Sequence, residues 1–312
     1  MGDITKEIRH QRIICISGAS GFLGNAAIHK FARSGYKVVA LSRPTSKFIP
    51  WDHDDAVVQI NGTVDDWISV IKEEKPAHVI SFDWSGVSRE SRDDSLQQES
   101  NVDRVSRLAE VSKSVGAKSF MALGSQAEIK PSIHTISESE ADEPQSLYGV
   151  AKITTRQQIQ SILAESETRF IWGRVFTVYG PGDIRDSLIT QLIKKLRSNE
   201  NFDISNPNGL WSFLYIDDFT EAIYALHKDI RISGIVNIGN PKSSKIGEVV
   251  DHIAASLGKS RNVTKSVSTD PKAMDLTWIP DTSTLTGLDW SPKISLNTGL
   301  ENTIRWWEQN SK

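Results

Sequence analysis

The chain has 312 residues, 38% of them hydrophobic and 24% charged, and a formal net charge of −3. This composition is typical of a folded globular protein with a sizeable core, and it excludes a disordered chain. The charge balance offers no positive field to a nucleic acid or an anionic membrane, so we expect neither as a partner.

The cysteine content and the apolar runs bear on the cellular compartment. The single cysteine, Cys15, lies in the apolar run "RIICISG". This excludes an internal disulfide and is typical of a small core residue in a reducing compartment. The first ten residues lack the apolar core of a signal peptide, and no run approaches the roughly 18 apolar residues of a membrane helix. We therefore expect a cytoplasmic protein.

Apolar runs alternate with helical patterns through the first half of the chain. The runs lie at 12–17, 37–42, 77–82, 119–123 and 169–175. Between them, apolar residues recur every three or four positions at 21–35, 65–74, 101–116 and 149–166. Near-continuous apolar strands are typical of a sheet that helices cover on both faces. The order predicts an α/β fold, a Rossmann-type doubly wound parallel sheet.

The pattern loosens after about residue 180, where Gly and Pro become frequent, as in "SNPNGL" and "GNPKSS". We interpret 1–180 as a dinucleotide-binding Rossmann domain that also receives parts of 211–240. The remainder, 181–312, is predicted to be mainly a smaller α/β substrate-binding region. Such folds bind ligands at the carboxyl ends of the strands.

A glycine-rich turn joins the first strand to the first helix. Gly18, Gly21 and Gly24 follow the strand at three-residue spacing. Glycines so placed permit a tight turn and a close approach to a pyrophosphate, and the helix N-terminus then faces the phosphates. The sequence therefore predicts a dinucleotide site.

The second strand ends in Ser42 and Arg43 instead of the acidic residue that binds the ribose hydroxyls of NAD. A guanidinium and a hydroxyl suit a 2′-phosphate, so the pattern favours NADP(H) over NAD(H). A solvated turn is the alternative interpretation.

Tyr148 and Lys152 are four residues apart in a helical pattern and therefore share a face. An ammonium near a phenol lowers the pKa of the phenol towards working pH. Such a pair arises often by chance, but Ser125 lies at the carboxyl end of the preceding strand. Strand ends in a doubly wound sheet face the cofactor crevice.

Motifs along nearly the whole chain carry a resemblance: "GASGFLG", "YGVAK", "GRVFTVYGPGD", "FLYIDDFTEAI", and "LDWSP" followed by "GLENTIRWW". The chain resembles the extended short-chain dehydrogenases/reductases of the nucleotide-sugar epimerase, dehydratase and ketoreductase family. The resemblance implies that Tyr148 gives or takes the proton at the reacting oxygen. It implies that Lys152 binds the nicotinamide ribose and that Ser125 hydrogen-bonds the reacting oxygen.

The resemblance also implies two sets of binding residues and a homodimer. The cofactor set is Gly18, Ser20, Gly21, Phe22, Leu23, Ser42, Arg43, Thr63, Val64, Phe82, Asp83, Trp84, Asn101, Tyr148, Lys152 and Val175. The substrate set is Ser125, Gln126, Thr177, Arg185, Trp211 and Lys272. The homodimer would pair the helices near 95–115 and 147–164. The seven histidines are scattered without metal-ligand spacing, so we expect no metal.

Departures from the family pattern narrow the reaction. Where 4,6-dehydratases place Asp and Glu after the catalytic hydroxyl, this chain has Gln126 and Ala127, which cannot act as acid or base. Ile129-Lys130 replaces the usual Tyr-Gly. Trp211 replaces an arginine that binds the nucleotide diphosphate. The cations that could take over this contact are Arg174, Arg185 and Lys272.

These features predict an NADPH-dependent reductase of a nucleotide-linked 4-keto-6-deoxy sugar. Hydride would go to C4, with Tyr148 as the proton donor. The first alternative is an NAD-dependent nucleotide-sugar 4-epimerase, which uses the same three residues. A reductase of a non-nucleotide ketone and a non-catalytic dinucleotide-binding sensor are the others. The sequence does not distinguish the sugar, the nucleotide or the product stereochemistry.

Overall fold

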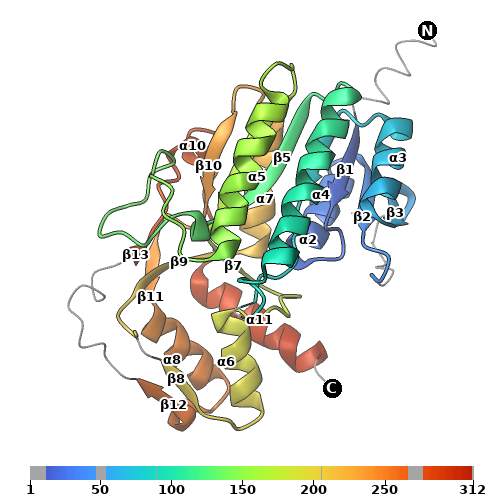
Figure 1. The fold of residues 1–312 in the computed structure, drawn as a ribbon. Coiled ribbons are helices and arrows are strands. Elements are labelled where there is room, and N and C mark those ends of the chain that lie inside the picture. Colours follow the sequence, from blue (N-terminus) through green and yellow to red (C-terminus); the bar gives the residue numbers. More distant parts are fainter. Residues whose placement is uncertain (1–11, 47–53, 89, 205, 266–276, 311–312) are drawn as a thin grey trace. The chain divides into compact units, whose positions relative to one another are not determined.

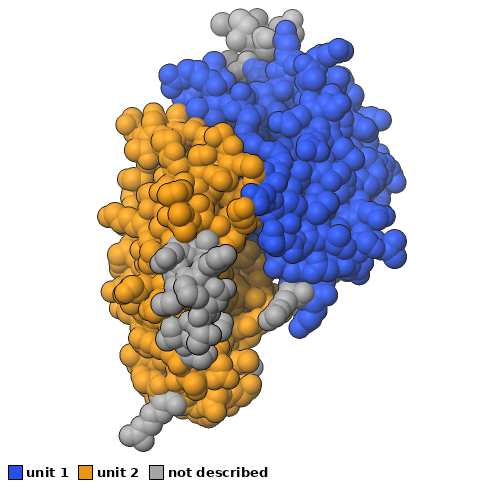
Figure 2. Space-filling model, turned by 60° about the vertical axis from the view of Figure 1, so that its left-hand side comes forward, with its two compact units in different colours: residues 1–128, 142–174, 223–236 blue, residues 129–141, 175–222, 237–312 orange. Residues whose placement is uncertain are grey.

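The computed structural model describes residues 12–46, 54–88, 90–204, 206–265 and 277–310 (Figure 1). The chain forms two compact units, coloured separately in Figure 2. The first comprises 1–128, 142–174 and 223–236, and the second comprises 129–141, 175–222 and 237–312. Segment 129–141 thus belongs to the second unit and segment 223–236 to the first.

The central sheet has seven strands in the order β10-β6-β5-β4-β1-β2-β3. Their bounds are Ile13–Ser17 (β1), Lys37–Ser42 (β2), Val57–Asn61 (β3), His78–Ser81 (β4), Ser119–Ser125 (β5), Arg169–Val175 (β6) and Gly234–Ile238 (β10). Strand β1 pairs in parallel with β2 on one side and β4 on the other, so that Cys15 lies between Val39 and Val79. The chain order reverses at β1, and doubly wound sheets bind ligands beyond the carboxyl ends at such a switch point. The predicted α/β fold is confirmed.

Helices cover both faces of this sheet. Their bounds are Phe22–Arg33 (α2), Val64–Glu74 (α3), Ser95–Ser114 (α4), Leu147–Leu163 (α5) and Ile216–Lys228 (α7). Figure 1 shows α4 and α5 side by side along one face. On that face Cys15 joins a buried cluster with Trp67 of α3, Leu108 of α4 and Ile159 of α5. Because successive strand residues alternate between faces, burial on both sides explains the continuous apolar runs.

Helices α3 and α5 each begin with a side-chain N-cap. Thr63 and Asp66 form a reciprocal capping box at α3, with the Thr63 amide 2.7 Å from the Asp66 carboxylate. The Ser146 hydroxyl accepts from the amide of Gly149 at 3.2 Å and begins α5. These caps satisfy amide groups that the first helical turn leaves without partners.

The second unit contains a small sheet, β11-β9-β13 with β7 alongside β9, and a separate β12–β8 pair. The strands are Thr177–Tyr179 (β7), Phe202–Ile204 (β8), Leu210–Tyr215 (β9), Ser243–Lys245 (β11), Val263–Lys265 (β12) and Thr277–Trp278 (β13). The helices are Leu188–Arg197 (α6), Ile246–Ser256 (α8), Ser283–Thr286 (α10) and Leu296–Asn310 (α11). In the part of the chain that the structure describes, no helix is long and apolar enough to cross a membrane.

Candidate active site

The glycine-rich turn packs closely against the end of β4 and the start of α2. Gly18 has φ +74°, and a Cβ there would lie 2.6 Å from the carbonyl carbon of Phe82. A Cβ on Gly24 would overlap the carbonyl oxygen of Gly18. Gly21 is the N-cap of α2, and no described side chain caps this end. A helix N-terminus without a side-chain cap fits the phosphates of a dinucleotide. Ser20, Phe22 and Leu23, also predicted here, lie in the same turn and first helical residues.

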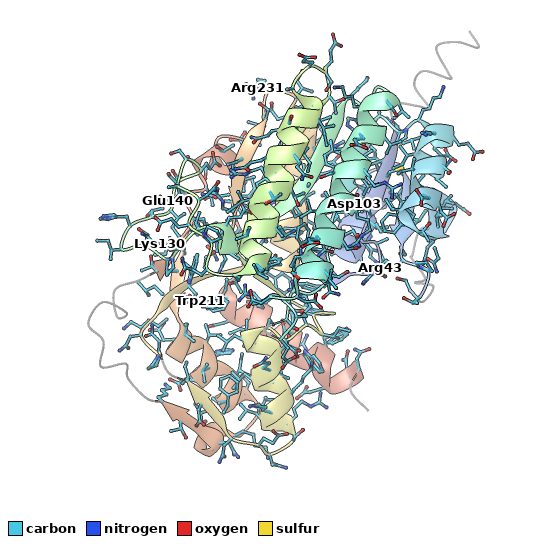
Figure 3. All side chains as sticks on the ribbon, viewed as in Figure 1. Arg43, Asp103, Lys130, Glu140, Trp211 and Arg231 are labelled. Carbon is cyan, nitrogen blue, oxygen red and sulfur yellow. The ribbon has the colours of Figure 1, made fainter. Side chains whose placement is uncertain are left out.

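Two predicted cofactor residues lie at the carboxyl end of β2. Ser42 is buried, and its hydroxyl has no hydrogen-bond partner within the described residues. Arg43 is exposed (Figure 3), and its guanidinium donates to the Ser85 hydroxyl at 3.0 Å. Ser20 and Ser46 share a hydrogen bond of 3.0 Å between their hydroxyls. A cation and several hydroxyls therefore lie close together at the carboxyl end of β2.

The segment after β4 is held by a buried network. Asp83 is 4% exposed, and its carboxylate accepts from Nε of Arg104 at 2.5 Å. Arg104 also donates to the side-chain oxygen of Asn101 at 2.6 Å. Asn101 in turn accepts from the Ser85 amide at 3.0 Å and donates to the Ser85 carbonyl at 2.8 Å. Asn101 therefore fixes the cofactor-side loop in this structure. Phe82 continues β4, its amide donating to the Ser17 carbonyl at 3.0 Å.

Of the predicted cofactor residues on α3, Thr63 is its N-cap and Val64 its first residue. Both lie at the start of the helix that follows edge strand β3. The hydroxyl and backbone amide of Thr63 are already engaged by the Asp66 carboxylate, at 2.8 and 2.7 Å. In this structure Thr63 therefore has a clear role in starting the helix.

The structure brings Tyr148 and Lys152 together at the end of β5. Lys152 is 4% exposed, and its ammonium donates to the carbonyl of Leu123 at 2.7 Å. The ammonium lies 5.6 Å from the centroid of the Tyr148 ring and 3.5 Å from that of Trp84. The Tyr148 and Trp84 rings meet edge to face, with centroids 5.9 Å apart. The ammonium thus lies against the end of β5, two residues before Ser125, the last residue of that strand.

Burial lowers the pKa of Lys152 to about 7, and the charges of Glu128 and Asp83 act in the opposite direction. Desolvation disfavours an ammonium because the charged form loses its hydration. A strongly shifted pKa in a crevice is a mark of functional sites.

The turn after β5, Gln126–Glu128, carries the residues that replace the dehydratase carboxylates. The hydroxyl of Ser125 accepts from the amide of Ala127 at 3.2 Å. The side-chain oxygen of Gln126 is buried and accepts no hydrogen bond within the described residues. The end of β5 and this turn therefore present the Ser125 hydroxyl and the Gln126 side-chain amide, and neither is a carboxylate.

The sequence reasoning missed Glu128, which is fully buried. Its carboxylate accepts from the Ser125 amide at 2.6 Å, from the indole of Trp172 at 3.0 Å and from Nε of Arg174 at 3.4 Å. A Cβ on Gly124 would overlap both the Trp172 indole and this carboxylate, so only glycine fits there. The signal in the sequence is an acidic residue three positions after the serine. Arg174, a candidate for the diphosphate, is fully buried in this ion pair.

Arg92 is a second residue that the sequence did not single out. Its guanidinium lies 5.6 Å from the centroid of the Tyr148 ring. Its Nε is buried and has no hydrogen-bond partner within the described residues. A guanidinium without a carboxylate partner is suited to an anionic group of a ligand.

Four predicted residues belong to the second unit, and one lies outside the described residues. Val175 ends β6, and Thr177 begins β7. Arg185 is held by Asp183, with Nε 2.7 Å from the carboxylate, and its side chain is 35% exposed. Trp211 lies in β9 (Figure 3), 6.2 Å from Phe213 between ring centroids. Lys272 falls outside the described residues.

The strand order, the glycine turn and the Tyr148–Lys152 helix together define a dinucleotide-dependent enzyme on a Rossmann fold. Residues 14–239 match the NAD dependent epimerase/dehydratase family, and the protein belongs to that family. The family and the enzyme class predicted from the sequence are thereby confirmed.

Individual relatives match different shares of the chain. The chain is 25% identical over 301 residues to CDP-abequose synthase of Salmonella muenchen, covering 93% of this chain and 96% of that protein. It is 29% identical over 141 residues to UDP-glucuronate 4-epimerase of Thermodesulfobacterium geofontis, covering 44% and 42%. The solved structure of MoeE5 in complex with UDP-glucose and NAD has a TM-score of 0.82 at 22% identity, covering 96% of this chain and 99% of that one. At that identity the structural likeness shows the fold alone.

Proposed function

We propose that the protein is an NADPH-dependent reductase of a nucleotide-linked 4-keto-6-deoxy sugar. The observation that carries the proposal is the end of β5. There, Tyr148 and Lys152 lie together while Gln126 and Ala127 supply no acid or base for the loss of water. The name of the relative aligned over 93% of the chain, CDP-abequose synthase, supports a nucleotide sugar as the substrate.

Three residues of the chain, Ser125, Tyr148 and Lys152, have separate roles in ketone reduction. The nicotinamide, when bound, supplies the hydride for C4. Tyr148 gives its phenolic proton to the oxygen on C4, so that the carbonyl becomes an alcohol. The Ser125 hydroxyl donates a hydrogen bond to the same oxygen. Lys152 stabilises the phenolate that Tyr148 becomes.

The choice of NADPH rests on the end of β2. Arg43 is exposed and lies beside Ser85, and Ser20 and Ser46 provide hydroxyls at the same corner. A guanidinium forms strong hydrogen bonds with a phosphate, and no carboxylate follows Ser42 at the strand end to repel one.

A nucleotide-sugar 4-epimerase that holds NAD is the second candidate. It is favoured by the family description, which names NAD, and by the UDP-glucuronate 4-epimerase alignment. A 4-epimerase needs the same Tyr148 and Lys152 but regenerates its cofactor in each cycle.

One experiment separates the two candidates. The purified protein is denatured and its released cofactor identified. The protein is then assayed for oxidation of NADPH and NADH with 4-keto-6-deoxyglucose linked to CDP, dTDP, UDP or GDP. Turnover with NADPH and one of these sugars supports the reductase. Stoichiometric NAD⁺ in the preparation, together with interconversion of 4-epimers, would establish the epimerase instead.

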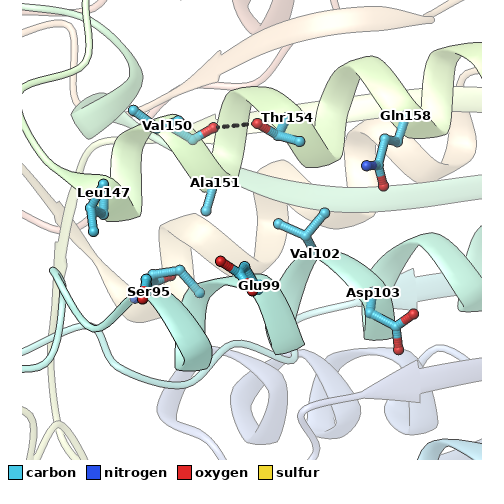
Figure 4. A pocket seen from close by; sticks show the side chains of 10 residues that line it. Ser95, Glu99, Val102, Asp103, Leu147, Val150, Ala151, Thr154 and Gln158 are labelled. Carbon is cyan, nitrogen blue, oxygen red and sulfur yellow. Dashed lines mark hydrogen bonds between the residues drawn. The ribbon is translucent and has the colours of Figure 1, made fainter.

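We also propose a homodimer formed through α4 and α5. A groove of about 470 Å³ runs between these helices (Figure 4). Three apolar side chains on these two helices are exposed: Leu96 of α4 is 77% exposed, and Leu147 and Val150 of α5 are 43% and 45% exposed. Such side chains on neighbouring helices suit helix packing between subunits.

A further inference from the structure

The indole of Trp84 lies against the charged end of Lys152. The Lys152 ammonium is 3.5 Å from the centroid of the Trp84 ring, well within the range of a cation–π contact. The indole N–H donates to the side-chain oxygen of Gln98 on α4 at 3.0 Å. The amide of Gln98 donates in turn to the carbonyl of Gly86 at 3.0 Å. Gln98 is 3% exposed, so the indole is held in place by a buried side chain.

Lys152 needs such a contact because its surroundings disfavour a charge. Its side chain is almost fully buried, and burial lowers its pKa to about 7. The only hydrogen bond found for the ammonium in the described chain is to the carbonyl of Leu123, at 2.7 Å. An ammonium can make three hydrogen bonds, so a single carbonyl leaves it under-coordinated, and the face of the indole supplies a second favourable contact.

The charged groups around Lys152 offset one another in part. Glu128, on the turn after β5, and Asp83, after β4, both favour the ammonium form. However, Asp83 is paired with Arg104 of α4 and Glu128 with Arg174 of β6. On α5 itself the Tyr148 ring lies 5.6 Å from the ammonium, and Arg92 lies over that ring. Within the described residues, the ammonium lies against the Leu123 carbonyl and the face of Trp84.

We propose that Trp84 is a positioning residue that keeps Lys152 charged and directed at the reacting end of the site. Trp84 acts through Lys152, since an aromatic face stabilises an ammonium but has no such effect on a neutral amine. The consequence for catalysis rests on the function proposed above. The effect of Trp84 on the charge of Lys152 does not.

The direct test is the titration of Lys152 by NMR in protein labelled with ¹³C at lysine Cε. The Lys152 signal is identified by its absence from the K152R variant. We expect W84L to lower the Lys152 pKa by about 0.4 to 1.5. W84F, which keeps an aromatic face, should lower it less. W306L, a change in the second unit, should leave it unchanged.

A series of fluorinated tryptophans at position 84 separates the electrostatic effect of the ring on Lys152 from an effect of its shape. Tryptophans carrying one to three fluorines, introduced at position 84 alone, weaken the negative face of the ring with little change in shape. We expect the Lys152 pKa to fall stepwise with each added fluorine. A flat series, or a W84L titration identical to that of the parent, would overturn the proposal. Because neither measurement requires turnover, their outcome is separate from that of the reductase assay.

The same series then measures the effect on turnover. If Tyr148 is the proton donor, the alkaline limb of the kcat/KM profile should move to lower pH in step with the Lys152 pKa. If Lys152 responds to the fluorines but the Y148F variant keeps parental turnover, the role proposed for Trp84 holds and the proposed reaction fails.

Discussion

The carboxylate of Glu128 accepts a hydrogen bond of 2.6 Å from the backbone amide of Ser125. Ser125 ends β5 and Glu128 lies in the turn that follows, and the carboxylate also accepts from Trp172 and Arg174 of β6. The strand that ends at the serine is therefore tied to its neighbouring strand by a buried charge. Three donors depend on this single carboxylate: the Ser125 amide, the Trp172 indole and the Arg174 guanidinium.

Removal of Glu128 should destabilise the protein. In E128A the buried guanidinium of Arg174, the indole of Trp172 and the Ser125 amide lose an acceptor, which should cost about 3–5 kcal/mol in the free energy of unfolding. E128Q keeps one acceptor oxygen and should cost less. Urea denaturation measures both. The exposed Glu140 (Figure 3) is the control, and E140A should change stability by less than about 0.5 kcal/mol. An E128A variant as stable as E140A would refute the role of this carboxylate.

Arg43 should determine the choice between the two nicotinamide cofactors. Hydrogen bonds to a charged group contribute about 1.5–3 kcal/mol, so R43A should weaken NADPH binding by roughly 10- to 150-fold. The affinity for NADH should change little because NADH lacks the 2′-phosphate. Isothermal titration with each cofactor measures this. R231A, which removes an exposed arginine paired with Asp229, is the control. Equal losses for both cofactors would mean that Arg43 does not read the phosphate.

Y148F should abolish most turnover without affecting the cofactor site. Loss of a positioned proton donor typically slows a reaction by about 10²- to 10⁴-fold. NADPH affinity should stay within a few-fold of the parent, since the ring and its contact with Trp84 persist. Steady-state rates and cofactor titrations give the two values. Y224F is the matched control, because that tyrosine packs on Phe31 in the same unit. Parental turnover in Y148F would eliminate the proposed mechanism.

The sequence predicted those parts of the fold that local patterns determine. Strand β1 and its glycine turn could be read directly, because both faces of β1 are buried and Gly18 needs a positive φ. Edge strand β3 was missed because Val58 is 43% exposed and polar residues interrupt the apolar pattern. The apolar pattern alone predicts α4 only from 101, whereas the helix starts at Ser95, because its first turn carries few apolar residues.

The missed parts of the site depend on partners distant in the chain. Glu128 is buried only because Trp172 and Arg174, 44 and 46 residues later, supply its donors. No spacing rule links these positions. Likewise, the sequence placed Trp84 near the cofactor, but only the packing of α4 and α5 shows its ring on Lys152. The roles assigned to the site residues stay predictions until the variants above are measured.

Two histidines that meet edge to face at the opposite end of the sheet should make the fold sensitive to acid. His78 begins β4 and lies 4.4 Å from His227 of α7 between ring centroids. His78 contacts the Ser119 hydroxyl at 2.8 Å, and His227 contacts the Tyr36 hydroxyl at 2.8 Å. Burial, with Arg169 nearby, lowers the pKa of His78 to about 4 and, with His78 adjacent, that of His227 to about 3.

The depressed pKa values fix the direction of the effect. Below pH 6.5 the unfolded chain takes up protons that the folded protein excludes. Stability should therefore be complete above pH 6.5 and fall with decreasing pH until the folded pKa values are reached. Each histidine contributes at most about 1.4 kcal/mol per pH unit in that window. Urea denaturation at pH values from 5 to 8, in steps of about one pH unit, measures how steeply the free energy of unfolding changes with pH. H227F, which keeps an aromatic ring against Phe31, should roughly halve the slope, whereas H134A at an exposed position should not change it. A slope unchanged in H227F would show that this pair does not govern the acid sensitivity.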